Sequence, residues 1–225
     1  MERILIALVA LVSFCVQGVQ SQTDQQRRAC VVVSLLENGV VAGYGTGTLI
    51  EHNGRRLILS CAHVARGMDD VGVIDATPAE ACQIRYMGGV CKAVEVAADA
   101  DADIAVLTAD ELPEDLVPFR VATTPAKIGE GLRLLTRGGM SAERSHCRFK
   151  SAVIGPGSDE YHAFVACLVQ SGDSGAAYLN DAGEVVGLQS SGMPRNEFGN
   201  GESKRYWPSY GPSLEPILAV LESVK

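Results

Sequence analysis

Three short segments of this chain carry a histidine, an aspartate and a serine that together could perform nucleophilic catalysis. They are SCAHV around His63, DADIAVL around Asp103 and SGDSGAA around Ser174. A serine hydroxyl is a weak nucleophile near neutral pH, so it needs an imidazole to take its proton and a carboxylate to orient that imidazole. Asp103 follows His63 by 40 positions, and Ser174 follows Asp103 by 71. The pattern predicts that Ser174 is a nucleophile activated by His63.

The segments around these residues have the pattern of short β-strands separated by turns. Asn38-Gly39 and Asn53-Gly54 each lie between apolar runs, and Asn-Gly is the strongest short signal for a β-hairpin. Further short apolar runs follow in DIAVLTA, LRLLTRGG, CRFKSAVIG and HAFVACLV. Many short strands at regular spacing are typical of a β-sandwich or β-barrel, so we expect an all-β fold.

Two helices are expected among these strands. CAHVARG is a short one that carries His63. SLEPILAVLESVK is the C-terminal one, in which Ser213 suits the N-cap and proline is tolerated in the first turn. Its apolar residues recur at helical spacing and share one face; they are Leu214, Ile217, Leu218 and Leu221.

Composition and charge exclude some functions. The chain has 225 residues, of which 47% are hydrophobic, enough for one large all-β domain or two small ones. Its net charge is −8, because 27 acidic residues outnumber 19 basic ones. The basic residues are scattered, so the sequence lacks the basic patch of a nucleic-acid-binding protein. We expect the acidic stretch AADADADIA to be a solvated loop; a calcium site is the alternative, but a recognised ligand spacing is missing. We expect no metal and no cofactor.

The first 21 residues have the layout of a secretory signal peptide. Arg3 opens a short polar start, an apolar run follows over residues 4–16, and cleavage after Ser21 or near Gly18 fits the small residues there. A membrane anchor is the alternative, but the run is shorter than the roughly 20 residues that span a bilayer. We expect a secreted or periplasmic protein without membrane contact after signal removal.

Six cysteines remain beyond the signal segment. An even number in an exported chain is typical of a disulfide framework, although buried free thiols are the alternative. No CxxC pair is present, which argues against zinc and redox roles. Proximity suggests the pairs Cys82–Cys91 and Cys147–Cys167, which leaves Cys30–Cys61.

LSCAHVARG, DIAVL and GDSG resemble the three signature segments of the chymotrypsin-like, or trypsin-fold, serine peptidases. GTGTLI before the histidine and GEVVGLQSSG after the serine resemble the bacterial-type branch that includes the HtrA-like enzymes. The resemblance runs from Val31 to the C-terminal helix. HtrA-like enzymes usually continue into a PDZ domain, which we do not expect here.

The resemblance implies two packed six-stranded antiparallel Greek-key β-barrels with a C-terminal helix. Residues 1–21 would be the signal peptide, 22–122 the N-terminal barrel with His63 and Asp103, and 123–225 the C-terminal barrel with Ser174 and the helix.

The resemblance also implies a role for each residue of the constellation. Ser174 would attack the scissile carbonyl, His63 would take and return the proton, and Asp103 would hold the imidazole. Asp101 is the alternative, but Asp103 directly precedes the apolar IAVL run as the family motif requires. The backbone N–H groups of Gly172 and Ser174 would form the oxyanion hole.

In the family, an aspartate before the nucleophile pairs either with a processed N-terminus or with an arginine of the second barrel. Here that aspartate is Asp173, and the chain has no IVGG-like start. We therefore expect Asp173 to pair with Arg137, with Arg133 as the alternative.

Substrate selection is implied by four further positions. Leu168 lies six residues before Ser174, at the position of the primary pocket's base, and Ser190, Ser191 and Gly192 would pair with the substrate backbone. An apolar base cannot compensate the charge of a buried Lys or Arg. The expected cleavage is therefore after small or medium apolar residues.

The sequence predicts an exported serine endopeptidase whose partners are protein or peptide substrates. A non-catalytic or latent binding protein on the same scaffold is the alternative, although such proteins usually lose a triad residue. An esterase with a G-x-S-x-G elbow would have the order Ser, Asp, His, which differs from this chain.

Overall fold

The computed structural model describes residues 27–69, 72–79, 81–109, 111–137, 148–156, 162–167, 169, 171–192 and 207–224. The expected signal peptide lies outside these residues. In the described ranges, every helix is too short or too polar to cross a membrane.

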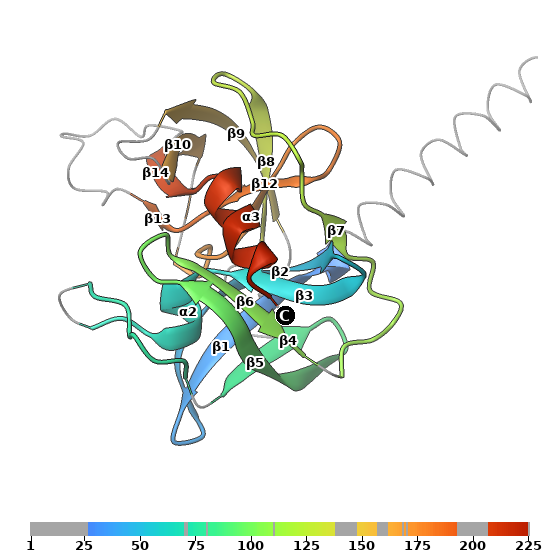
Figure 1. Cartoon of the computed structure of the whole chain (residues 1–225), viewed down its shortest axis with the longest axis vertical. Coiled ribbons are helices and arrows are strands. Elements are labelled where there is room, and N and C mark those ends of the chain that lie inside the picture. The colour runs from blue at the N-terminus through green and yellow to red at the C-terminus, as the bar shows by residue number, and fades with distance from the viewer. Residues whose placement is uncertain are drawn as a thin grey trace, which may run out of the picture.

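Seven strands of the N-terminal half form one sheet in the order β1-β4-β5-β6-β3-β2-β7 (Figure 1). β1 also pairs with β2, so the six strands other than β7 close into a barrel, and β7 runs parallel to β2 at its side. The strand bounds are β1 (Cys30–Glu37), β2 (Val40–His52), β3 (Arg55–Ser60), β4 (Cys82–Tyr86), β5 (Gly89–Asp99), β6 (Ile104–Thr108) and β7 (Phe119–Arg120).

The two Asn-Gly hairpins are formed as the sequence predicts. Asn38 and Asn53 adopt φ of 52° and 51°, and the glycine after each also has positive φ. Two successive positive φ values give the tight turn whose twist matches that of the flanking strands. The first turn joins β1 to β2 and the second joins β2 to β3.

The C-terminal half forms a second seven-stranded sheet in the order β12-β11-β8-β9-β10-β14-β13. Its two ends, β12 and β13, are separated along the chain only by Gln189 and Ser190, so the sheet must roll up on itself. Gly211 in β14 marks this closure, because a Cβ there would lie 1.9 Å from the carbonyl oxygen of Leu188. The strand bounds are β8 (Gly131–Thr136), β9 (Arg148–Pro156), β10 (His162–Cys167), β11 (Ala177–Leu179), β12 (Val185–Leu188), β13 (Ser191–Gly192) and β14 (Trp207–Pro212).

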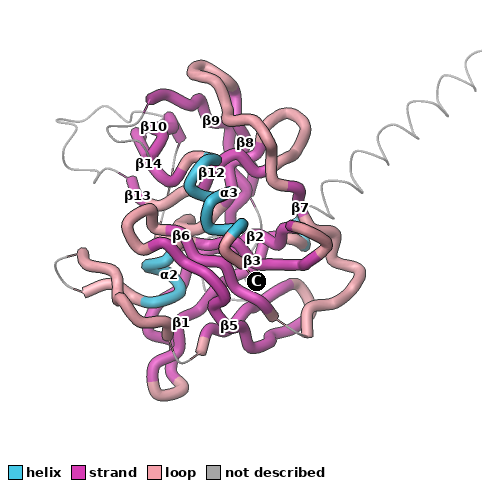
Figure 2. Tube along the Cα trace, viewed as in Figure 1, coloured by secondary structure: helices cyan, strands magenta, loops and turns pink. Residues whose placement is uncertain are grey.

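Both halves therefore share one topology. If β12 and β13 are counted as a single interrupted strand, each barrel has six strands whose order around the barrel is first, second, third, sixth, fifth, fourth. This is the expected all-β fold of two antiparallel Greek-key barrels, and Figure 2 shows how little of the tube is helical.

Helix α3 (Leu214–Glu222) packs against β5 and β6 of the first barrel and β12 of the second (Figure 1). Leu214, Ile217 and Leu221 are buried as predicted. Leu218, which was also expected to be buried, is only partly buried, and Val220 is buried instead. Ser213 has the extended backbone of an N-cap, and its hydroxyl donates to Glu215 rather than capping a backbone N–H. The helix joins the two barrels along an apolar stripe.

The expected disulfides Cys82–Cys91 and Cys30–Cys61 are wrong, because the structure forms neither bond and buries all four cysteines. In the β4–β5 ladder Cys82 lies opposite Ala93, and Cys91 lies opposite Ile84. The two cysteines are therefore diagonal neighbours, about 7–8 Å apart, beyond the usual Cα separation of a disulfide. Cys147 and the side chain of Cys167 lie outside the described residues, so their pairing stays a prediction.

Thiol titration tests this result. Without reductant, at least four thiols should react in denaturant, and these four should react very slowly in the folded protein because each is buried. A denatured, unreduced protein with fewer than four reactive thiols would contradict the structure, and prior reduction provides the reference count.

Candidate active site

His63 is carried by the one-turn helix α2 (Ala62–Arg66), which follows β3 directly. The helix buries Ala62, Val64 and Ala65 and ends at Gly67, whose φ of 91° lets its N–H reach the carbonyl of His63 at 3.1 Å. Burial of three small apolar residues fixes the helix on the barrel and leaves the imidazole on the open side. The sequence prediction of a short helix carrying His63 is confirmed.

Asp103 lies at the end of the turn before β6 and has a φ of 56°, in the left-handed region that aspartate tolerates better than most residues. Its carboxylate accepts the backbone N–H of His63 at 2.9 Å and lies 2.8 Å from Nδ1 of the same residue. Asp101, the alternative, is exposed at the rim of the cleft. The structure thus places Asp103, and not Asp101, against the imidazole.

The environment of Asp103 favours its ionised form. Burial alone would raise its pKa, but hydrogen bonds and charge from His63, together with a hydrogen bond from Ser190, outweigh burial and hold the pKa below the ordinary aspartate value. An ionised carboxylate can only accept, so Nδ1 of His63 must carry the proton. Nε2 is then the basic nitrogen.

Ser174 lies in a loop between two glycines with positive φ, Gly172 at 88° and Gly175 at 82°. A Cβ on Gly175 would lie 2.1 Å from the carbonyl oxygen of Thr46, so the loop can approach β2 only with glycine there. The Ser174 hydroxyl donates to the carbonyl of Ser190 at 3.0 Å. To give its proton to His63, it must first leave this acceptor.

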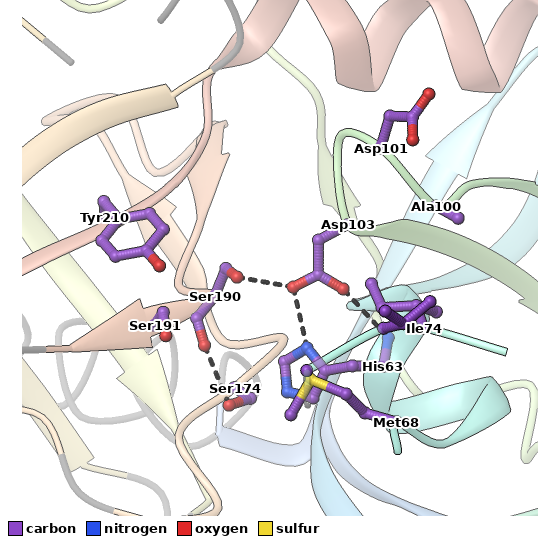
Figure 3. A pocket seen from close by; sticks show the side chains of 12 residues that line it. His63, Met68, Ile74, Ala100, Asp101, Asp103, Ser174, Ser190, Ser191 and Tyr210 are labelled. Carbon is purple, nitrogen blue, oxygen red and sulfur yellow. Dashed lines mark hydrogen bonds and ion pairs between the residues drawn. The ribbon is translucent and has the colours of Figure 1, made fainter. Parts of the chain in front are cut away.

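These residues border a cleft of about 720 Å³ (Figure 3). His63, Met68 and Ile74 lie on one side, and Ser190, Ser191 and Tyr210 lie on the other. The first group belongs to the N-terminal barrel and the second to the C-terminal barrel. The cleft therefore follows the junction of the two barrels, and it brings together the histidine, aspartate and serine that the sequence singled out.

Ser190 has a contact that sequence reasoning missed. It was expected only on the substrate strand, but its hydroxyl also donates to Asp103 at 2.5 Å. The two residues are 87 positions apart, and no local motif marks the pair. Only the docking of the two barrels reveals that Ser190 helps to hold the carboxylate.

Cys61, His63 and Asp103 are the one group of potential metal ligands found in the described part of the chain, with donor atoms within 4.8 Å of one another. Burial, together with the charge of Asp103, raises the pKa of the Cys61 thiol well above its ordinary value. The protonated thiol donates to the Gln189 carbonyl at 3.2 Å. A protonated thiol beside a carboxylate already bound to His63 fits a metal ion poorly.

The expected ion pair of Asp173 and Arg137 is not what the structure shows. Asp173 is fully buried and accepts a short hydrogen bond from the hydroxyl of Thr136. The buried guanidinium of Arg137 donates instead to the carbonyl of Cys30 at 3.0 Å, across the barrel junction. Arg133, the alternative, donates to the carbonyl of Asn180.

The remaining predicted residues are placed only in part. Gly172 is buried, and its carbonyl accepts the Thr46 hydroxyl at 2.8 Å. Ser191 and Gly192 form β13, opposite Tyr210 and Ser209 of β14. Leu168, the expected pocket base, lies outside the described residues.

Replacing Ser190 tests the charge balance at Asp103. The change Ser190→Ala removes a hydrogen bond that favours the carboxylate, so the pKa of Asp103 should rise. Because that pKa is lowered on folding, the ionised group stabilises the fold above the ordinary aspartate pKa of about 4, and the stabilisation is lost as pH falls through the folded value. In the variant this loss should begin at higher pH, as followed by carboxyl NMR and acid unfolding. Ser191→Ala is the control; an unchanged Asp103 titration would contradict the contact.

A model of the trypsin-like peptidase domain matches residues 45–188, which include His63, Asp103 and Ser174. No curated protein matches the sequence significantly.

Solved structures resemble the whole two-barrel arrangement. The active form of the Rv3671c protease from M. tuberculosis has a TM-score of 0.63 at 20% identity, over 90% of this chain and 83% of that one. An inactive form of the same protein has a TM-score of 0.62 at 18% identity, over 88% and 87%. The serine endoprotease from Yersinia pestis has a TM-score of 0.65 at 19% identity, over 89% of this chain and 64% of that one.

At these identities the structural likeness establishes the fold, and the domain match establishes the family. The chain belongs to the trypsin-like peptidases, and is thus a hydrolase of the serine endopeptidase type.

Proposed function

We propose that this peptidase cleaves proteins or peptides through an acyl-enzyme on Ser174, with His63 as general base and Asp103 as the group that orients it. One observation carries the proposal. The Asp103 carboxylate holds both the backbone N–H and Nδ1 of His63, and this pair shares a cleft with Ser174 in a member of a peptidase family.

The hydrogen bonds support a specific division of labour. Because Asp103 fixes the proton on Nδ1 of His63, Nε2 is free to take the proton of Ser174 as the hydroxyl attacks the scissile carbonyl. The imidazolium that forms is stabilised by the ionised Asp103. It then returns the proton to the leaving amine, and water releases the acyl group by the reverse sequence.

The oxyanion of the tetrahedral intermediate would be bound by the backbone N–H groups of Gly172 and Ser174. Such donors act on charge that exists only near the transition state, and the loss of one costs roughly 10²–10³ in rate. The positive φ of Gly172 supports this assignment, since only glycine enters that conformation without strain.

The substrate backbone would pair with Ser190, Ser191 and Gly192. Among the described strands, β13 ends its sheet and has β14 on one side, so an extended peptide would pair with its other edge. Leu168 would form the apolar base of the primary pocket. The signal segment 1–21 would direct export, with barrels over residues 22–122 and 123–225, and the branch would be the HtrA-like one.

A latent enzyme is the second candidate, and the resting contact of Ser174 favours it. Its hydroxyl donates to the Ser190 carbonyl, an acceptor that the proposed substrate strand would offer to an incoming peptide. In this form the nucleophile is not yet paired with its base. A substrate or partner that occupies the Ser190 carbonyl would release the hydroxyl toward His63.

Labelling by a fluorophosphonate probe tests the triad. The purified protein should be labelled, and Ser174→Ala and His63→Ala should abolish labelling. Asp103→Asn should lower peptide hydrolysis by about 10⁴, because the imidazole loses its required tautomer. Asp101→Asn is the matched control and should retain activity. Labelling that survives Ser174→Ala would contradict the proposal, and absence of labelling until a peptide is added would favour the latent enzyme.

A peptide library tests the primary pocket. Cleavage should follow small or medium apolar residues, because an apolar pocket base offers a basic side chain no counter-charge. Leu168→Asp should shift cleavage toward Lys and Arg. Cleavage by the unaltered enzyme mainly after Lys or Arg would contradict Leu168 as the pocket base.

A further inference from the structure

We propose that Gln189 is a positioning residue whose side chain holds the substrate strand β13 in place, so that it determines how well extended peptides bind. The inference rests on the proposed function, because it requires that substrates pair with β13. It concerns a residue that touches neither the substrate nor the reacting atoms.

The main chain of Gln189 connects the segments that carry the catalytic residues. Its N–H donates to the carbonyl of Ala176 at 2.8 Å, and its carbonyl accepts the N–H of Gly175 at 2.7 Å. The same carbonyl accepts the thiol of Cys61 at 3.2 Å. Gly175 follows the nucleophile, and Cys61 precedes the histidine helix. These backbone contacts remain whatever side chain stands at position 189.

The side chain of Gln189 makes a separate set of contacts, directed at the substrate strand. Its Nε2 donates to the carbonyl of Ser191 in β13 at 2.8 Å. Its Oε1 accepts a short hydrogen bond from the hydroxyl of Tyr178 in β11. That hydroxyl lies 3.1 Å from Oγ of Ser209, the residue opposite Gly192 in the β13–β14 ladder. The amide thus joins β13 to β11 directly, and to β14 through the Tyr178 hydroxyl.

In the described residues β13 is short, and the Gln189 amide adds to its pairing with β14. Its two residues, Ser191 and Gly192, lie opposite Tyr210 and Ser209, and the N–H of Ser190 just before them donates to the carbonyl of Tyr210 at 3.1 Å. Gln189 is itself 2% exposed, and Tyr178 and Ser209 are buried equally well. A hydrogen bond in such a dry environment is strong, and a partner left unpaired there is costly.

Position 189 requires an amide, because the side chain must accept from Tyr178 and donate to Ser191 at once. A glutamate of the same shape would offer two acceptors when ionised and would repel the Ser191 carbonyl. The change Gln189→Glu should therefore displace β13 while leaving the backbone contacts to the nucleophile loop. Its effect should fall on the binding of extended substrates.

The experiment compares Gln189→Glu with the unaltered enzyme on peptides of increasing length on the acyl side of the scissile bond. For long peptides, kcat/KM should fall about 10- to 100-fold, mainly through KM. In the unaltered enzyme, kcat/KM should increase as residues are added to the peptide, and the variant should lose most of this increase. Labelling by a fluorophosphonate, which does not reach β13, should slow far less. Gln83→Glu, the same change on β4 of the other barrel, is the control.

Tyr178→Phe provides a second variant that removes a single hydroxyl, and circular dichroism checks that both variants fold. Tyr178→Phe should also raise KM for long peptides, but by less than Gln189→Glu does. If Gln189→Glu fails to fold, the effect of Tyr178→Phe on KM for long peptides tests the inference instead. Unchanged length dependence in the folded variants would overturn the inference, as would equal losses of labelling and kcat with KM unchanged. An unaltered protein that neither labels nor cleaves would instead overturn the proposed function.

Discussion

A backbone hydrogen bond between the barrels, from the N–H of Thr46 to the carbonyl of Ser174 at 2.7 Å, fixes the loop that carries Ser174 against β2. His63 and Asp103 belong to one barrel and Ser174 to the other, so the site exists only if two backbones approach this closely. Glycine makes the approach possible on both sides, since a Cβ on Gly45 would lie 2.7 Å from the Ser174 carbonyl, and one on Gly175 would collide with Thr46. The rest of the site depends on this contact.

Near this contact, a chain of hydrogen bonds between polar groups crosses the junction of the two barrels. Ser174 donates to the Ser190 carbonyl, the Ser190 hydroxyl donates to Asp103, and Asp103 holds His63. A buried carboxylate is stable only when donors surround it, and here the donors come from both barrels. The same arrangement that orients the histidine also joins the barrels, which couples the geometry of the site to the docking of the two halves.

The sequence was least informative where distant segments meet. Neither expected disulfide is formed. For Cys82 and Cys91, the β4–β5 register places Ala93 opposite Cys82, so the two cysteines lie diagonally, and strand register cannot be read from composition or spacing. Arg137 was expected to form an ion pair with Asp173, but its guanidinium donates to the backbone carbonyl of Cys30 in the other barrel. The contact of Ser190 with Asp103 and the amide network of Gln189 also depend on strands that are far apart in the chain.

By itself, the sequence determined what short-range chemistry controls. The Asn-Gly turns, the short apolar strands, the helix that carries His63, and the motifs around Asp103 and Ser174 are all local patterns. The tertiary structure decided how the second sheet closes at Gln189 and Ser190, which hydroxyl supports the carboxylate, and where the resting Ser174 proton lies. The physical reason is that these depend on strand register and barrel docking, which are set by the packing of the whole core.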